Sequence, residues 1–290
     1  MVSTQNVHGI KVAMLGLGAM NLAILQALFK AGIQPENVVG TTMSASSAKS
    51  TSLELGIRVL AASEGPGANR KAVDGVDLVI VGVLPDKVTD ICVEISQLLP
   101  DHALVVSVAA GVKVAALEAA LEPGQPVIRT MPNTPLAVGS GSVGLSAGRH
   151  ADESDVDRLC GLLAPGGRVH VIPEAQMDAF NAIAGSAPGY LYYLAEHMTE
   201  AGVGLGFDQK TAARITADTL LGAARILSAE IVDDPEAAGD LRLEMVLPGG
   251  TTSAAFDTFG ALAMDEAILS GVRSSAECSA AISREIAAAD

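Results

Sequence analysis

The stretch Val12-Ala13-Met14-Leu15-Gly16-Leu17-Gly18-Ala19-Met20-Asn21 decides the fold of the first half of the chain. An apolar run ends in two closely spaced glycines, and a helical pattern follows them. We therefore predict a strand, a tight turn and the N-terminus of a helix. Gly16 would let the chain turn out of the strand. Gly18, which lacks a Cβ, would let the backbone approach a pyrophosphate held by free N–H groups of the helix.

The glycine pattern is incomplete at its third position. In the pattern G-x-G-x-x-G the third glycine permits close packing of helix and strand, and this position holds Asn21. By itself the stretch is as consistent with an ordinary glycine turn as with a dinucleotide site. A side chain at this point should also shift a bound pyrophosphate slightly.

The next segment bears on which dinucleotide would bind. After a helix from about Ala19 to Ala31, residues 37–42 form a second short strand, which completes a βαβ unit. NAD-preferring proteins of this kind carry an Asp or Glu at the end of that strand, which binds the adenosine ribose and repels a 2'-phosphate. Here the position holds Thr41 and Thr42, followed by serines. This loop favours NADP(H), although a plain polar surface loop would have the same composition.

Further apolar runs alternate with helical patterns along the first 173 residues. The strands are predicted at 77–83, 103–108, 126–131, 143–146 and 168–172. Such alternation predicts an α/β fold with a doubly wound, mostly parallel, Rossmann-type sheet, whose ligands bind beyond the carboxyl ends of the strands. The segments at these ends are Gly16–Met20, Val83–Pro85 and Ala109–Gly111.

The strand pattern ends near Pro173, and the remaining chain is predicted to be helical. Candidate helices are 175–198, 208–227, with Asp208 as N-cap, 253–269 and 272–288. We therefore divide the chain into a dinucleotide-binding domain, residues 1–173, and an all-helical substrate and dimerisation domain, residues 174–290. Helices this long and apolar imply a partner, such as an interlocking second copy. The break Leu247–Thr252 fits either a capped helix start or a site for an anion or substrate.

Composition excludes several classes of partner. The 290 residues are 49% hydrophobic but only 3% aromatic, and the net charge of −15 argues against nucleic-acid and anionic-membrane partners. Three distant cysteines disfavour disulfides and zinc, and they are expected to be core thiols in a reduced compartment. The histidines are scattered, so no metal is expected. Without a leader pattern or a long apolar run, we expect a cytoplasmic protein.

Six segments, in order, resemble the Δ1-pyrroline-5-carboxylate reductase family. They are Gly16–Met20, Val83–Pro85, Ser107–Val112, Val127–Pro135, Gly185–Tyr190 and Pro248–Thr252. The resemblance covers nearly the whole chain. It implies an N-terminal dinucleotide-binding domain, a C-terminal helical dimerisation domain, and an active site between the first domain and the partner's second. It also implies NAD(P)H-dependent reduction of a cyclic imine, Δ1-pyrroline-5-carboxylate, to L-proline, in homodimers that can assemble further. NADPH is the expected cofactor, with NADH as the alternative.

The resemblance also implies roles for individual residues. The implied cofactor residues are Gly16, Gly18, Ala19 and Met20 at the pyrophosphate, Thr41 and Thr42 near the 2'-phosphate, and Asn69, Val83, Leu84, Pro85, Ala109 and Ala110 along the rest of the dinucleotide. Gly250, Thr251 and Thr252 would hold the substrate carboxylate, with Thr252 next to the imine nitrogen. Because threonine is a weak acid, we expect Thr252 to orient that nitrogen and relay a proton, while positioning provides most of the rate.

Several positions depart from the family pattern. Leu84 replaces the usual lysine and Leu247 the usual serine, while Asn21 and Ala187 replace glycines and Ala184 a common serine. Losing polar groups near the site should weaken recognition of a small carboxylate and favour apolar contacts. A substituted or larger cyclic imine is therefore the alternative substrate.

Two other functions remain open at this point. A β-hydroxyacid dehydrogenase has a similar domain order but needs a helix lysine as acid, and Lys210, the only lysine after residue 173, lies outside any matching motif. A cofactor-binding sensor that has lost turnover would account for Leu84 and Leu247. The presence of Thr252 argues against such a sensor.

Overall fold

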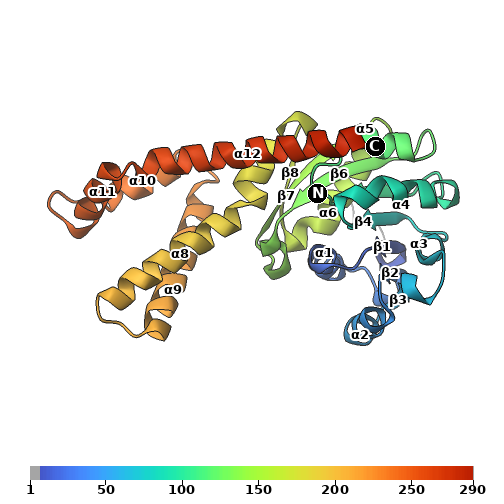
Figure 1. The fold of residues 1–290 in the computed structure, drawn as a ribbon, viewed down its shortest axis with the longest axis horizontal. Helices are drawn as coiled ribbons and strands as arrows, with labels where there is room; N and C mark the ends of the chain where they lie inside the picture. Colours follow the sequence, from blue (N-terminus) through green and yellow to red (C-terminus); the bar gives the residue numbers. More distant parts are fainter. Residues whose placement is uncertain (1–6, 290) are drawn as a thin grey trace. The chain divides into compact units, whose positions relative to one another are not determined.

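The computed structural model describes residues 7–289, which form two compact units (Figure 1). The first unit extends to Ser186 and takes in the chain from Ser275 onward, and the second unit comprises Ala187–Ser274. The first unit therefore contains both the sheet and the end of the last helix. The division at residue 173, which was placed where the strand pattern ends, stays a prediction.

The first unit is built on an eight-stranded sheet with the order β3-β2-β1-β4-β5-β6-β7-β8. The strands are β1 Val12–Leu15, β2 Val38–Thr42, β3 Arg58–Ala61, β4 Leu78–Val81, β5 Leu104–Ser107, β6 Val127–Pro132, β7 Gly141–Ala147 and β8 Gly167–Val171. Neighbouring strands are parallel except β6 and β7. The predicted doubly wound, mostly parallel sheet is confirmed, and its strand order reverses between β1 and β4.

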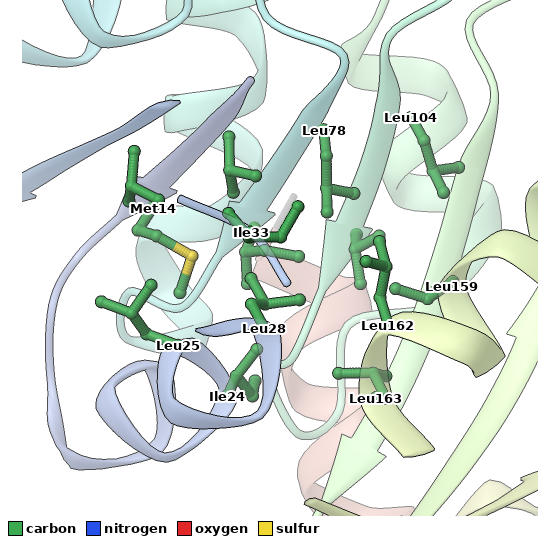
Figure 2. Packing of buried hydrophobic residues seen from close by; sticks show 14 of the residues in the cluster. Met14, Ile24, Leu25, Leu28, Ile33, Leu78, Leu104, Leu159, Leu162 and Leu163 are labelled. Atoms are coloured by element: carbon green, nitrogen blue, oxygen red, sulfur yellow. The ribbon is translucent and has the colours of Figure 1, made fainter. Parts of the chain in front are cut away.

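Helices cover both faces of this sheet because alternate strand residues point to opposite sides. The helices of the first unit are α1 Ala19–Lys30, α2 Ala45–Leu55, α3 Ala68–Ala72, α4 Val88–Ile95, α5 Val114–Ala120, α6 Glu153–Leu163 and α7 Met177–Phe180. On one face Met14, Leu78 and Leu104 pack against α1 and α6 (Figure 2). On the other face Leu15 and Val79 join a second core with α3, α4 and α5.

The remaining chain is helical, as predicted, but its helices begin and end elsewhere. They are α8 Ala187–Gly204, α9 Gln209–Glu230, α10 Ala237–Glu244, α11 Thr251–Ala261 and α12 Met264–Ala289. The prediction of a single helix over 253–269 was wrong, because Ala263 has a φ of +52° and separates α11 from α12. The predicted helix 175–198 is divided by a π-helical turn, Asn181–Gly185. Asp208 caps α9 as predicted, and its carboxylate accepts a hydrogen bond from the Thr211 N–H.

Within the first unit, the last turns of α12 contact α7 through serines four residues apart. Asp178 Oδ1 accepts hydrogen bonds from the hydroxyls of Ser279 and Ser283, at 2.8 and 3.1 Å. On the same helix, Ile282 and Ile286 lie against Gly111, where a β-carbon would be 2.6 Å from Ile286 Cδ1. These contacts bring the end of α12 onto the loop that follows β5.

Candidate functional site

The ends of β1, β2 and β4 meet at the glycine turn. Gly16 has a φ of +82°, and a β-carbon there would lie 2.8 Å from Val83 Cγ1 and 3.0 Å from the Gly82 carbonyl oxygen. The Gly16 N–H donates to Thr41 Oγ1 at 3.1 Å, and the Leu17 N–H donates to the Thr41 carbonyl at 2.8 Å. The structure therefore brings together three of the predicted cofactor segments.

The first turn of α1, which begins after Gly18, presents backbone N–H groups at this edge of the sheet. Gly18 is the N-cap of α1, in extended conformation, and no side chain caps the helix. Gly18 and Ala19 are exposed, Met20 is half-buried, and a β-carbon at Gly18 would have no atom within 4 Å. An uncapped helix N-terminus with a glycine at its entrance can bind an anion such as a pyrophosphate.

The two threonines at the end of β2 differ in their surroundings. Thr41 is buried, and its hydroxyl oxygen accepts the Gly16 N–H, so this side chain is part of the turn itself. Thr42 is half-buried, and its hydroxyl donates to the Ser44 carbonyl at 3.2 Å. Ser44 caps α2, and its side chain accepts the Ser47 N–H. No carboxylate belongs to this loop, so a 2'-phosphate would meet hydroxyls and N–H groups.

The remaining predicted cofactor residues lie at the carboxyl edge of the sheet or next to it. Leu84 is 71% exposed, and Pro85 begins a short 3-10 turn before α4. Ala109 is buried and its N–H donates to Ser107 Oγ, while Ala110 is half-buried. Asn69, on α3, uses its side chain to donate to Glu94 on α4, at 3.0 Å. The predicted contact between Asn69 and a dinucleotide stays a prediction.

The structure adds one residue to the site that the sequence motifs did not indicate, Gly82. It follows β4, and a β-carbon there would collide with the Asn21 amide. The only signal in the sequence is a glycine inside the apolar run of residues 77–83. Its meaning depends on the pairing of β1 with β4, which no local pattern specifies.

The predicted substrate residues begin α11 in the second unit. Gly249 has a φ of +73°, Gly250 is the N-cap, and no side chain caps the helix. Thr251 is exposed and Thr252 is half-buried. Among the described residues, none forms a hydrogen bond with the Thr252 hydroxyl. The N–H groups of this turn and the free hydroxyl can therefore bind a carboxylate and a second polar atom.

The titratable side chains of the described residues bear on metal and thiol chemistry. Within residues 7–289 no three His, Cys, Asp or Glu side chains gather in a way that could hold a metal ion. Burial raises the pKa of Cys92 to about 12, so this thiol is inert at neutral pH. The expectation that all three cysteines are core thiols was wrong for Cys278, which is exposed. No helix in the described part is long and apolar enough to span a bilayer.

Comparisons with known proteins agree with this architecture. A family model described as pyrroline-5-carboxylate reductase dimerisation matches residues 174–282, and one described as NADP oxidoreductase coenzyme F420-dependent matches residues 11–111. Pyrroline-5-carboxylate reductase 1 of Bacillus subtilis is 32% identical over 277 residues, covering 95% of this chain and 90% of that protein. Pyrroline-5-carboxylate reductase of Pseudomonas aeruginosa is 31% identical, covering 95% of this chain and 98% of that protein.

A solved structure is similar over the same range. The pyrroline-5-carboxylate reductase of Coxiella burnetii has a TM-score of 0.82 and 26% identity, covering 94% of this chain and 98% of that one. The two curated relatives each match 95% of the chain, so both units are included in the similarity. The chain therefore belongs to the pyrroline-5-carboxylate reductase family.

Proposed function

We propose that the chain reduces Δ1-pyrroline-5-carboxylate to L-proline with NADPH, and that Thr252 contacts the imine nitrogen. Membership of the family supplies the coarser statement, that the chain is an NAD(P)H-dependent oxidoreductase acting on a C=N bond. The observation that carries the finer proposal is the start of α11, where uncapped N–H groups and the free Thr252 hydroxyl share one turn.

The reaction adds a hydride to the imine carbon and a proton to the imine nitrogen, so that C=N becomes CH–NH. The nicotinamide supplies the hydride when the cofactor is bound. The Gly250 N–H donates to the Leu247 carbonyl at 2.8 Å. The N–H groups of Thr251 and Thr252, which follow the N-cap Gly250, therefore hold the substrate carboxylate, because an uncapped helix N-terminus favours an anion. The Thr252 hydroxyl donates to the imine nitrogen and relays the proton from solvent. The rate then comes mainly from the positioning of the carbon that accepts the hydride.

The residues of the first unit fit a phosphorylated dinucleotide. Gly18, Ala19 and Met20 hold the pyrophosphate, because the first turn of α1 is uncapped and free of side-chain obstruction. Thr42 and the serines that begin α2 face a 2'-phosphate, and no carboxylate there repels it. We therefore expect a larger kcat/KM with NADPH than with NADH, and the reverse order would contradict this assignment of Thr41 and Thr42.

The proposed activity is tested with purified protein, NADPH or NADH, and a panel of cyclic imines, by following the absorbance of the reduced cofactor. Pyrroline-5-carboxylate should be reduced, and proline should be recovered as the product. A panel in which NADPH binds but no imine is reduced would favour the sensor function instead.

Two exposed leucines favour a second candidate, reduction of a substituted or larger cyclic imine. Leu84 and Leu247 are 71% and 69% exposed, and both stand where the family pattern has a polar residue. Exposed apolar side chains on loops of this kind contact an alkyl group better than a small carboxylate. A higher kcat/KM for alkylated imines than for pyrroline-5-carboxylate would establish this candidate.

We propose that the second unit forms the interface with a second copy of the chain. A groove of about 840 Å³ runs along α8, α11 and α12, and its lining is apolar. It includes Tyr190, Tyr193, Phe259, Met264 and Ile268, and several of these side chains are exposed. Contiguous apolar surface of this kind marks an interface. The match of this segment to a dimerisation family supports a homodimer. A further assembly of dimers and a cytoplasmic location stay predictions.

The dimer is tested by placing a charge in the groove. Ile268→Asp should convert the protein to a monomer in light scattering, because an unpaired carboxylate would be buried at the interface. The control is Leu53→Asp on α2, which also replaces an exposed leucine but lies in the first unit. A dimeric Ile268→Asp protein would contradict the interface.

A further inference from the structure

Asn21 stands where the family pattern has a glycine, and its side chain is buried in the glycine turn. Its exposed fraction is 1%. The amide Nδ2 donates to the Gly16 carbonyl at 2.9 Å and lies 3.3 Å from the Leu15 carbonyl, which also accepts. The side chain therefore reaches back from the first turn of α1 to the end of β1 and the start of the turn.

Gly82 supplies the space for this amide. A β-carbon at Gly82 would collide with Cγ, Nδ2 and Oδ1 of Asn21. Gly82 is also tied to the turn, because its N–H donates to the Leu15 carbonyl at 2.9 Å and its own carbonyl lies against Gly16. Asn21 and Gly82 are thus matched in size, and together they join the β1–α1 turn to the end of β4.

The amide holds one peptide group in particular, the one between Gly16 and Leu17. Its carbonyl accepts from Asn21 Nδ2, and its N–H donates to the Thr41 carbonyl at 2.8 Å. A peptide group is planar, so holding both ends fixes its orientation. That orientation determines where Gly18 and the first N–H groups of α1 point.

Stability alone does not account for this asparagine. Its Oδ1 is buried, and among the described residues it has no hydrogen-bond partner. An unpaired buried amide oxygen destabilises the folded state, and an apolar side chain would avoid that cost. Only the amide can donate to the two carbonyls.

We infer that Asn21 is a positioning residue for the dinucleotide, with Gly82 as its size-matched partner. The amide replaces the close helix–strand contact of the third glycine by hydrogen bonds that hold the pyrophosphate-binding turn. The inference rests on the proposed use of this turn by NADPH.

The test measures NADPH affinity by titration without imine, together with KM for NADPH and kcat. Asn21→Ala should raise Kd and KM for NADPH about ten-fold with kcat changed less than about two-fold, because the lost interaction acts on cofactor binding. The fold should persist, since the Leu15 and Gly16 carbonyls keep backbone partners in Gly82 and Gly18. Gly82→Ala should weaken NADPH binding at least as much by displacing the amide.

A double variant separates the pair from general destabilisation. Asn21→Gly with Gly82→Ala removes the collision, so this protein should bind NADPH more tightly than Gly82→Ala alone. The control is Gln125→Ala, because this buried amide also donates to two backbone carbonyls, those of Pro100 and Ala103. These groups lie at the amino ends of β5 and β6, away from the glycine turn. Gln125→Ala should lower stability and leave the NADPH Kd unchanged.

The outcomes distinguish the inference from the function on which it rests. If the wild-type protein fails to bind NADPH, the proposed function falls and the inference falls with it. If the wild type binds NADPH and Asn21→Ala has the same Kd as the wild type, the inference alone is overturned. It is also overturned if Asn21→Ala and Gln125→Ala have the same Kd. The same holds if the double variant binds no better than Gly82→Ala.

Discussion

Gly18→Val should weaken NADPH binding at least 100-fold, a loss of about 2.8 kcal/mol, while the protein stays folded. Gly18 has a φ of −89° and a ψ of −179°, which any residue adopts. A β-carbon there meets no protein atom within 4 Å. The added side chain would therefore begin in open space, where we propose that the pyrophosphate binds. As an N-cap change from glycine to an apolar residue, the substitution should cost about 1 kcal/mol of stability or less.

The effect is measured by NADPH titration together with urea unfolding. Gly161→Val is the matched control, because Gly161 is also exposed with open space at its β-carbon, but it lies on α6. That control should bind NADPH as the wild type does. Equal binding by Gly18→Val would show that the start of α1 does not hold the cofactor. Gly16 is a poorer test, since its φ of +82° would mix strain in the fold with loss of binding.

Much of the first unit could be predicted because its strands are buried on both faces. Runs such as residues 77–83 and 103–108 are continuously apolar, which is typical of parallel strands covered by helices. The edge strand β3 was missed, because Arg58 is exposed and Val59 and Leu60 are only half-buried. An edge strand of this length has no continuous apolar run and leaves little pattern in the sequence.

The breaks in the helical part were harder to predict. Ala263 takes a φ of +52° with no glycine or proline beside it, so the junction of α11 and α12 has no local signal. Tertiary context decides such a break. The pairing of Asn21 with Gly82 escaped prediction for the same reason, since 60 intervening residues separate two positions that meet only when β1 pairs with β4.

The site was predicted to the extent that its parts are local motifs. Gly16 and Gly18 indicate a turn and a helix start, and each of these motifs can be recognised from its immediate neighbours in the sequence. The sequence did not show that the Thr41 hydroxyl would accept a hydrogen bond from the Gly16 N–H, because this contact depends on the register of β1 and β2. The chemistry of a side chain can be known from the sequence when its partner cannot.

Thr252→Ala should lower kcat at least ten-fold, about 1.4 kcal/mol, with NADPH affinity unchanged. The Thr252 hydroxyl has no hydrogen-bond partner among the described residues, so its removal breaks no contact of the fold. Alanine also has the higher helix propensity, so α11 should not lose stability. A fall in turnover would then report on the substrate and not on folding.

Two further variants show whether the hydroxyl or the shape of the side chain matters. Thr252→Ser keeps the hydroxyl and should retain most of the turnover, whereas Thr252→Val keeps the shape and should be as slow as Thr252→Ala. Thr258→Ala is the control on the same helix, because the Thr258 hydroxyl donates to the Ala254 carbonyl and is engaged within α11. It should leave kcat unchanged. If Thr252→Val turns over at the wild-type rate, the hydroxyl relays no proton, and the N–H groups that begin α11 hold the imine by its carboxylate alone.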